Sequence, residues 1–430
     1  MSPFRNHVRW LLIAWMFVIS AVAYLDRVNL SVAGTSIERE FGLDHVHLGW
    51  VLSAFVFGYA VFQAPGGRLA DRFGPRKILA AGTIWWAVFT SLTALVSARI
   101  AGALLVLIAV RFLLGIGEAV VYPAGNRLVA SWIPSQERGI ANGVIFAGVG
   151  AGAGITSPLI TYILLHYGWR WSFWVSALIG LAAGVVWFVI ARDKPEEHPM
   201  VVPEEAAHIR LGLPAAAPQR PLPWRSIFAS KDVAAVTFSY FCYGYVAYIF
   251  FAWFFIYLNA VRGLNLKTSS YYSMLPFLAM AVGSTLGGWI SDVITKTLGK
   301  RAGRCGVACV SMCLCAIFVA IGSYAQDARV ASTVLAGGAG ALYLSQSSFW
   351  SVSSDLGGAS AGSVSGVMNM GNQIAGIITA SLTPWIAKYF HWETSFFVAA
   401  GLAVVGAMLW LRVDPNVQLV PRQEVALAEK

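Results

Sequence analysis

The chain carries apolar runs that are each long enough to cross a bilayer. A transmembrane helix needs about 20 consecutive apolar residues, whereas buried segments of soluble domains use runs of about 4–8. Charge clusters and Pro/Gly turns divide the sequence into twelve long runs, at residues 8–33, 46–66, 77–97, 101–129, 139–165, 170–191, 232–259, 268–291, 304–323, 329–351, 362–387 and 392–412. The pattern predicts an all-α membrane protein with twelve transmembrane helices.

The composition supports a membrane protein and excludes a large soluble domain. Of the 430 residues, 58% are hydrophobic and 12% are charged, whereas soluble domains carry about 25% charged residues. The formal net charge of +10 could indicate a nucleic-acid partner. In a membrane protein it has a simpler cause, because Lys and Arg accumulate in cytoplasmic loops. We therefore expect the lipid bilayer as a partner and no nucleic acid.

The positive residues also predict the orientation. If both termini are cytoplasmic, the cytoplasmic segments hold 21 Lys and Arg residues and the opposite segments hold seven. This bias follows the positive-inside rule, so both termini are expected in the cytoplasm. The first run is longer than the apolar part of a signal peptide and contains Asp26 and Arg27. It is therefore expected to be a retained helix.

The two halves of the chain are related by an internal repeat. Residues 67–71 (Gly-Arg-Leu-Ala-Asp) follow the second run, and residues 288–292 (Gly-Trp-Ile-Ser-Asp) follow the eighth, at an offset of 221. The repeat divides the chain into an N-terminal six-helix half, a hydrophilic linker, a C-terminal six-helix half and a tail, at residues 1–191, 192–231, 232–413 and 414–430. Parallel repeats of this kind are typical of transporters, whose substrate site lies between the halves near the membrane midplane.

The loop after the second run has a specific pattern. Gly67, Asp71, Arg72, Gly74 and Arg76 follow the spacing Gly-x-x-x-Asp-Arg-x-Gly-x-Arg. The aspartate can meet the partial positive charge of a helix N-terminus or a nearby arginine. This gating loop resembles the signature loop of the major facilitator superfamily, which implies two pseudo-symmetric halves of six helices. The second copy departs from the pattern after its aspartate, which leaves open whether the second gate is held in the same way.

Four charged residues lie in the interior of predicted spans, away from the span ends: Asp26, Arg27, Arg111 and Glu118. A charge at the bilayer centre costs about 2.5–3.5 kcal/mol on insertion scales, so each one is a candidate functional residue. Arg111 and Glu118 are two helical turns apart and share a face, whereas the adjacent Asp26 and Arg27 point about 100° apart. The alternative is a set of structural ion pairs with no net charge.

These residue types suit the transport of an organic anion. An arginine binds a carboxylate through two parallel hydrogen bonds and keeps its proton. Burial favours the neutral form of a carboxyl group, and a neighbouring arginine favours the charged form. Such a carboxylate can take up and release a proton as a substrate anion competes for its arginine. This is the minimum machinery for proton-coupled anion transport.

Several segments resemble the anion:cation symporter family, which contains bacterial hexonate and hexarate importers and vesicular glutamate carriers. The segments are residues 24–31, 111–119, 132–139, 257–258, 262–263 and 362–372. The resemblance implies that Asp26 and Glu118 are the protonatable pair. It also implies roles in substrate binding: Arg27 orients a carboxylate, Arg111 contacts the substrate anion or its carboxylate partner, Tyr59 lines the cavity, and Asn369 or Asn372 binds substrate hydroxyls or carboxylate.

Other features of the sequence give weaker evidence about function. The seventh run is rich in aromatic residues that either pack toward lipid or line the cavity: Tyr240, Tyr243, Tyr245, Tyr248, Trp253 and Tyr257. Cys305, Cys309 and Cys313 lie at helical spacing and are expected to pack rather than to bind metal. No nucleotide-binding motif occurs in the sequence. We expect no cofactor, no metal and no enzyme activity.

The sequence thus predicts a monomeric carrier of the bacterial inner membrane that imports a small organic anion with protons, by alternating access. Two alternatives remain open. One is an exporter of drugs or metabolites, although residues 156–160 lack the Gly-Pro-x-x-Gly-Gly pattern of such exporters. The other is a ligand sensor on a carrier scaffold. Sugar acids, dicarboxylates and aromatic acids all fit an arginine-lined cavity, so the substrate itself remains open.

Overall fold

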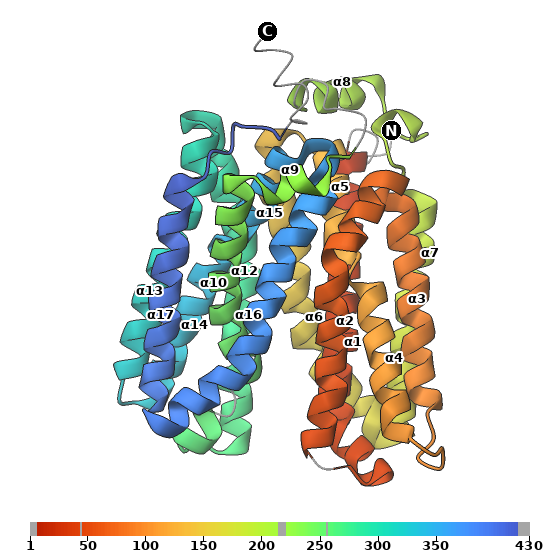
Figure 1. Cartoon of the computed structure of the whole chain (residues 1–430), viewed down its shortest axis with the longest axis vertical. Coiled ribbons are helices and arrows are strands. Elements are labelled where there is room, and N and C mark those ends of the chain that lie inside the picture. The colour runs from red at the N-terminus through yellow and green to blue at the C-terminus, as the bar shows by residue number, and fades with distance from the viewer. Residues whose placement is uncertain (1–6, 44, 214–220, 255–256, 420–430) are drawn as a thin grey trace.

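The apolar runs form long helices that lie side by side in a single bundle (Figure 1). The computed structural model describes residues 7–43, 45–213, 221–254 and 257–419. Among these residues there is no β-strand. Parts of the predicted linker (214–220), of the seventh span (255–256) and of the tail (420–430) lie outside the described residues. The predicted all-α fold is confirmed.

The first half of the bundle contains seven helices: α1 (Val8–Phe41), α2 (His45–Phe73), α3 (Pro75–Leu95), α4 (Ala103–Glu118), α5 (Val121–Trp132), α6 (Arg138–Tyr167) and α7 (Trp169–Ile190). Two short helices follow in the linker, α8 (Pro203–Gly212) and α9 (Trp224–Phe228). The second half contains α10 (Lys231–Ala252), α12 (Leu266–Leu298), α13 (Val307–Tyr324), α14 (Ala328–Leu344), α15 (Gln346–Gly357), α16 (Ala361–Tyr389) and α17 (Trp392–Leu409).

Ten helical segments in the described chain are long and apolar enough to cross a membrane. The other two predicted spans, 329–351 and 362–387, are also helical and lie within the bundle as α14 with α15 and as α16 (Figure 1). They are more polar because protein rather than lipid surrounds much of them. All twelve residues of α15 are buried, and five of them are serines.

The fourth and tenth predicted spans are each broken into two helices. The first break separates α4, which ends at Glu118, from α5, which begins at Val121. The second break separates α14, which ends at Leu344, from α15, which begins at Gln346. Broken helices near the membrane midplane are common around the substrate sites of transporters, because they expose polar groups there.

The two halves meet where α2 crosses α16 and α6 crosses α12. Glycines allow the backbones to touch at both crossings. A Cβ on Gly67 would lie 1.9 Å from the carbonyl oxygen of Gly362, and a Cβ on Gly288 would lie 2.3 Å from that of Gly139. The two crossings are related by the internal repeat, since Gly67 corresponds to Gly288. Any larger residue at these positions would force the halves apart.

The linker packs against one end of the bundle, which we call the linker side (Figure 1). Glu205 of α8 is 3% exposed and accepts hydrogen bonds from the backbone N–H groups of Val8 (3.1 Å) and Arg9 (3.2 Å) at the start of α1. The Arg9 guanidinium also contacts Glu205 (3.1 Å) and Glu137 (3.0 Å). This carboxylate therefore caps α1 and fixes α8 to the first half.

At the opposite end, which we call the far side, an ion pair joins α1 to α7. Arg170 binds Glu40 through two bonds of 2.6 Å, and the indole N–H of Trp169 donates to the same carboxylate at 2.8 Å. The hydrogen bond from Arg170 lowers the pKa of Glu40. The first half is thus fastened within itself at both ends.

We predict that Glu205→Ala lowers the free energy of unfolding by about 2–3 kcal/mol, because it removes charge-assisted hydrogen bonds from buried donors. Glu196→Ala is the matched control in the linker, since its 3.4 Å pair with Arg210 is exposed and should contribute less than about 1 kcal/mol. Thermal unfolding of the purified variants measures both effects. Equal losses in the two variants would contradict the capping role of Glu205.

Candidate functional site

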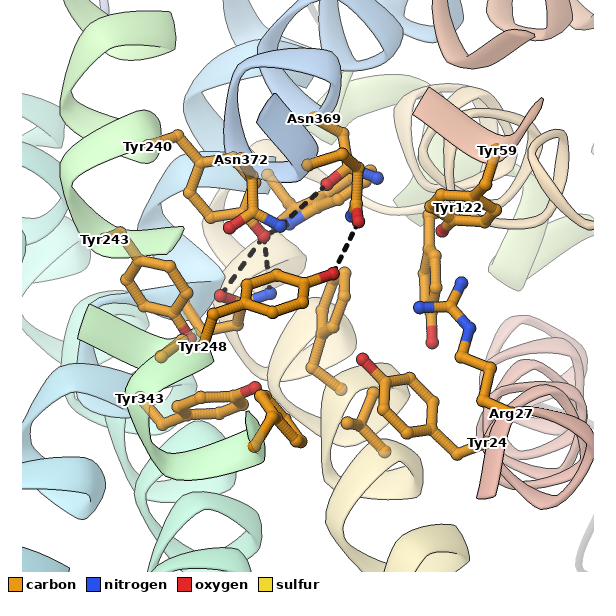
Figure 2. A pocket seen from close by; sticks show the side chains of 17 residues that line it. Tyr24, Arg27, Tyr59, Tyr122, Tyr240, Tyr243, Tyr248, Tyr343, Asn369 and Asn372 are labelled. Carbon is orange, nitrogen blue, oxygen red and sulfur yellow. Dashed lines mark hydrogen bonds between the residues drawn. The ribbon is translucent and has the colours of Figure 1, made fainter. Parts of the chain in front are cut away.

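A narrow cavity with about 430 Å³ of empty space, including its open side, lies between the two halves (Figure 2). Helices α1, α2, α5 and α6 form its wall on one side, and α10, α14, α15 and α16 form the other. Its polar and aromatic lining consists of Tyr24, Arg27, Tyr59, Tyr122, Phe146, Tyr240, Tyr243, Tyr248, Phe251, Tyr343, Gln346, Trp350, Asn369, Asn372 and Gln373. Aromatic walls with a few polar groups are typical of small-molecule sites.

Arg27 is the charged residue of this lining, all of which lies in the described chain. Its guanidinium carbon lies 4.2 Å from the ring centre of Tyr59, 4.9 Å from that of Tyr24 and 5.4 Å from that of Phe55. Its Nε donates a 2.6 Å hydrogen bond to Glu118, while its Nη2 is buried without a hydrogen-bond partner. The aromatic rings orient the cation, and the free N–H groups can bind a ligand.

Glu118, the last residue of α4, is the ion-pair partner of Arg27. One carboxylate oxygen accepts the bond from Arg27, and the other is buried without a partner. The break that follows Glu118 turns the chain into α5, which places Tyr122 in the cavity wall. An anion that binds Arg27 would therefore compete directly with Glu118.

Asp26 and Arg111 lie behind this wall rather than in it. Asp26 is 2% exposed and accepts a 3.3 Å hydrogen bond from the hydroxyl of Thr90 on α3. Arg111 is also 2% exposed, interacts electrostatically with Asp26, and lies 5.0 Å from the ring centre of Phe55. Its Nε and Nη1 are buried without partners. The four buried charges thus form a cluster in the first half that has no net charge.

The wall on the second half is built from hydroxyl and amide groups. Tyr240 accepts hydrogen bonds at its hydroxyl from the side chains of Gln346 (3.0 Å) and Trp350 (3.1 Å). Tyr248 donates to Gln373 at 2.6 Å. These bonds fix the side chains of three helices relative to one another (Figure 2). This wall can hold neutral polar groups of a ligand.

Nη2 of Arg27 is not the sole unpartnered group of the lining described here. Three further buried polar atoms of the lining also lack a hydrogen-bond partner. They are the hydroxyls of Tyr122 and Tyr243 and the side-chain oxygen of Asn372. A buried polar group without a partner costs about 1–3 kcal/mol, so a ligand that supplies partners gains this amount on binding. The Arg27 end offers donors to an oxyanion. The Asn372 oxygen on the other wall is free to accept a hydrogen bond from the ligand.

The structure brings together four of the predicted substrate-binding residues, since Arg27, Tyr59, Asn369 and Asn372 all line the cavity. Arg111 does not line it in this conformation. Sequence reasoning missed Tyr24, Tyr122, Gln346 and Gln373. Helical spacing could have indicated two of these, because Tyr122 lies four residues after Glu118 and Gln373 lies four residues after Asn369.

The seventh-span aromatics divide between the cavity and other positions. Tyr240, Tyr243 and Tyr248 line the cavity, whereas Tyr245, Trp253 and Tyr257 are absent from its lining. Tyr257 is 1% exposed and packs on the rings of Trp392 and Phe396.

The predicted gating loop lies on the linker side of the cavity. Asp71 accepts hydrogen bonds from the backbone N–H of Gly362 (2.9 Å) and of Ser363 (2.7 Å), at the start of α16. The Ser363 hydroxyl donates to it at 2.5 Å, and Arg127 lies 3.7 Å away. Both contacts considered from the sequence, a helix N-terminus and an arginine, are therefore present. The contact with the start of α16 joins the first half to the second, and the arginine lies within the first half.

The second copy of the loop makes the equivalent contact. Asp292 accepts hydrogen bonds from the backbone N–H of Gly139 (2.9 Å) and of Ile140 (2.6 Å), at the start of α6. Arg304 binds it at 2.7 Å and donates a 2.6 Å bond to the carbonyl oxygen of Ser135 across the interface. The two aspartates are therefore held alike by helix N-termini, although the arginines beside them come from different parts of the repeat.

The last three residues of the gating loop, Arg72, Gly74 and Arg76, stay within the first half. Arg72 is exposed and lies 5.2 Å from the Phe73 ring. Gly74 has a φ of 89°, which favours glycine, and touches Asp193. Arg76 donates its backbone N–H to Asp193 at 2.9 Å and packs on Phe188. These contacts connect the loop to the end of α7.

Further polar contacts between the halves gather near the gating loops. Arg138 binds Asp355 at 2.5 Å, and Asn126 donates to Ser353 at 3.0 Å. Toward the far side, the ribbons of the two halves diverge (Figure 1). The structure therefore has its halves joined on the linker side.

Comparisons with known proteins agree with this architecture. A family model described as Major Facilitator Superfamily matches residues 16–380. The probable sulfoacetate transporter SauU of Cupriavidus necator is 34% identical over 415 residues, covering 96% of this chain and 95% of that protein. The hexuronate transporter of Bacillus subtilis is 29% identical over 405 residues, covering 93% of each.

Among solved structures, that of the proton:xylose symporter XylE has a TM-score of 0.76 at 14% identity. The alignment covers 98% of this chain and 99% of the symporter. At this identity the likeness shows the fold alone.

We predict that Gly67→Ala opens the linker side, because its Cβ would overlap the Gly362 carbonyl. The readout is the rate at which a water-soluble maleimide modifies Ser353→Cys, in a chain whose five native cysteines are replaced by serine. Ser353 is fully buried in the closed interface, so the rate should rise several-fold. Gly49→Ala on the same helix is the control, since nothing lies within 4 Å of its Cβ. An unchanged rate in Gly67→Ala would contradict the prediction.

Proposed function

Because the chain belongs to the Major Facilitator Superfamily, as a multi-pass secondary transporter, we propose that it imports a small organic anion together with protons by alternating access. The observation that carries the proposal is the Arg27–Glu118 pair at the wall of the cavity between the halves. The pair combines a site for an anion with a group that can accept a proton.

The anionic end of the substrate binds Arg27. This residue supplies the positive charge of the cavity lining and already has an unpartnered N–H at Nη2. Tyr59 and Tyr24 hold the guanidinium in place, so little side-chain entropy is lost on binding. Relatives named as transporters of sulfoacetate and of hexuronate support an acidic substrate for this chain.

The rest of the substrate meets hydroxyl and amide groups. Tyr243, Asn369, Asn372 and Gln373 offer hydrogen bonds on the wall opposite Arg27 (Figure 2). This arrangement favours an acid whose other end carries hydroxyl groups or a second acidic group over one with a purely apolar tail. Sugar acids and small dicarboxylates fit it, while the tyrosine rings can also pack against an aromatic acid.

Proton coupling follows from competition for Arg27. When a substrate anion takes hydrogen bonds from this guanidinium, Glu118 loses the partner that stabilises its negative charge. A proton on Glu118 restores electroneutrality in the buried cluster, so substrate and proton bind together. Asp26 and Arg111 form the second part of the same cluster and are proposed to share the proton and the substrate charge.

Alternating access follows from the two gates. The positive-inside bias supports a cytoplasmic linker side in a bacterial cell, and on that orientation we propose that this structure is the state closed to the cytoplasm. Release requires the bonds at Asp71 and Asp292 to break, after which the halves rotate about the central site. We propose that one chain suffices for this cycle in the inner membrane.

We predict that Arg27→Gln strongly weakens binding of the acid. A charge-assisted hydrogen bond contributes about 1.5–3 kcal/mol, so affinity should fall by tenfold or more. The measurement is thermal unfolding of the purified protein against sugar acids, dicarboxylates, aromatic acids and their neutral analogues. A ligand at 100 times its Kd stabilises by about 2.7 kcal/mol.

The control for this experiment is Arg99→Gln, which removes an exposed arginine outside the cavity. It should keep the full response to the acid. Stabilisation only by neutral or cationic compounds would contradict the anion site and would favour an exporter. The same assay on Arg111→Gln shows whether this residue contacts the anion in solution.

We predict that Glu118→Gln loses uptake driven by a pH gradient but keeps exchange of substrate across the membrane. The amide cannot release a proton, yet exchange needs no net proton movement. Proteoliposomes with labelled substrate measure both activities. Glu40→Gln is the control, because its carboxylate lies outside the membrane span. Gradient-driven uptake at the normal rate in Glu118→Gln would exclude this coupling.

A further inference from the structure

A second cavity lies on the outside of the second half. It has about 750 Å³ of space, including its open side, and lies where α9, α10 and α16 meet. Its lining consists of Ile227, Phe228, Val233, Ala234, Thr237, Phe238, Phe241, Val367, Met370, Gly371 and Ile374. Apart from Thr237 every lining residue is apolar or glycine. We call it the α10–α16 groove.

The groove fits within one leaflet of the bilayer. Its lining on α10 runs from Val233 to Phe241, which spans about 12 Å of helix. This length is less than half of the hydrocarbon core, which is about 30 Å thick. Both helices begin on the linker side, so the groove lies in the leaflet of that side (Figure 1). Its lower end, at Phe241 and Ile374, lies near the middle of α10 and of α16.

The walls of the groove face outward rather than toward a partner helix. Phe228 is 60% exposed, Phe238 is 50% exposed and Ile374 is 42% exposed. The floor is close-packed, since a Cβ on Gly371 would lie 3.0 Å from the Thr237 methyl group. In a membrane-spanning chain, such an apolar recess is filled by hydrocarbon because water is excluded from it.

The upper rim of the groove is formed by α9, which lies across the linker-side end of the bundle (Figure 1). Leu222, just before α9, donates its N–H to the Ser360 hydroxyl at 2.7 Å and accepts a hydrogen bond from Arg68. The Arg68 guanidinium lies 5.7 Å from the Trp224 ring. The rim is therefore anchored to both halves of the bundle.

The rim carries positive charge. Arg225 on α9 and Lys231 at the start of α10 are exposed, and each lies two residues before a residue of the groove lining. The acidic residue of this segment, Asp232, accepts a hydrogen bond from the backbone N–H of Asp414 at 2.9 Å. Exposed cations above an apolar recess match an anionic headgroup above an acyl chain.

We propose that the α10–α16 groove binds an anionic phospholipid of the linker-side leaflet, with one acyl chain in the groove and the headgroup at Arg225 and Lys231. The lipid covers the exposed faces of Phe228, Phe238 and Ile374. Because α9 is anchored to both halves when the linker side is closed, the lipid stabilises the closed arrangement. The site is separate from the central cavity and shares no lining residue with it.

The test uses the full purified chain and native mass spectrometry, with phosphatidylglycerol and phosphatidylcholine of identical acyl chains as probes. Phosphatidylglycerol should remain bound when phosphatidylcholine has dissociated, and soluble glycerol 3-phosphate should not bind. Ala234→Phe fills the groove from α10, and Ile374→Trp fills it from α16. Each should weaken retention of phosphatidylglycerol by about tenfold, because several methylene groups lose their buried position.

Further variants separate the chain site from the headgroup site. Arg225→Gln and Lys231→Gln should each weaken the preference for phosphatidylglycerol over phosphatidylcholine by about fivefold. Ala182→Phe, at an exposed alanine of α7, is the matched control and should retain the lipid. Gel filtration verifies that each variant is folded.

Three results would overturn the proposal. Full retention of phosphatidylglycerol in both groove-filling variants would place the lipid elsewhere. Equal retention of both lipids by the unaltered chain would remove the role of the rim charges. A lipid-free dimer that dissociates in Ala234→Phe would show that a second copy of the chain covers the groove instead.

Discussion

Two carboxylates bound to helix N-termini hold this bundle in its observed state. Asp71 meets the start of α16, and Asp292 meets the start of α6. Each bond combines a charge with the partial positive charge of a helix end. The carboxylates can reach these N–H groups only because glycines at both crossings let the backbones touch.

The central cavity depends on these crossings, because they set the distance between its walls. The first half contributes a buried cluster of charges, of which Arg27 reaches the cavity. The second half contributes hydroxyl and amide groups such as Tyr240 and Asn369. The two halves thus make equivalent contacts at their gating loops, but they contribute different kinds of side chain to the cavity. This division lets one half bind the charge of a substrate while the other half forms hydrogen bonds with its polar groups.

The broken helices connect the repeat to the site. The break after α4 places Glu118 and Tyr122 beside the cavity, and the break after α14 does the same for Tyr343 and Gln346. A continuous helix would present its side chains at fixed spacing and its backbone groups only to itself. At these breaks, the chain can direct polar side chains toward the centre of the bundle without exposing unpaired backbone groups to lipid.

The sequence alone determined the fold class, because apolar runs of bilayer length can satisfy their backbone groups only as helices. It also indicated the family, the repeat and Arg27. Helical periodicity fixes which residues share a face but not which helix lies opposite. Only the tertiary structure therefore decided that Arg27 pairs with Glu118, 91 residues away, and that Arg111 lies behind Phe55. It likewise decided which tyrosines surround the cavity, since they come from five different helices brought together by packing.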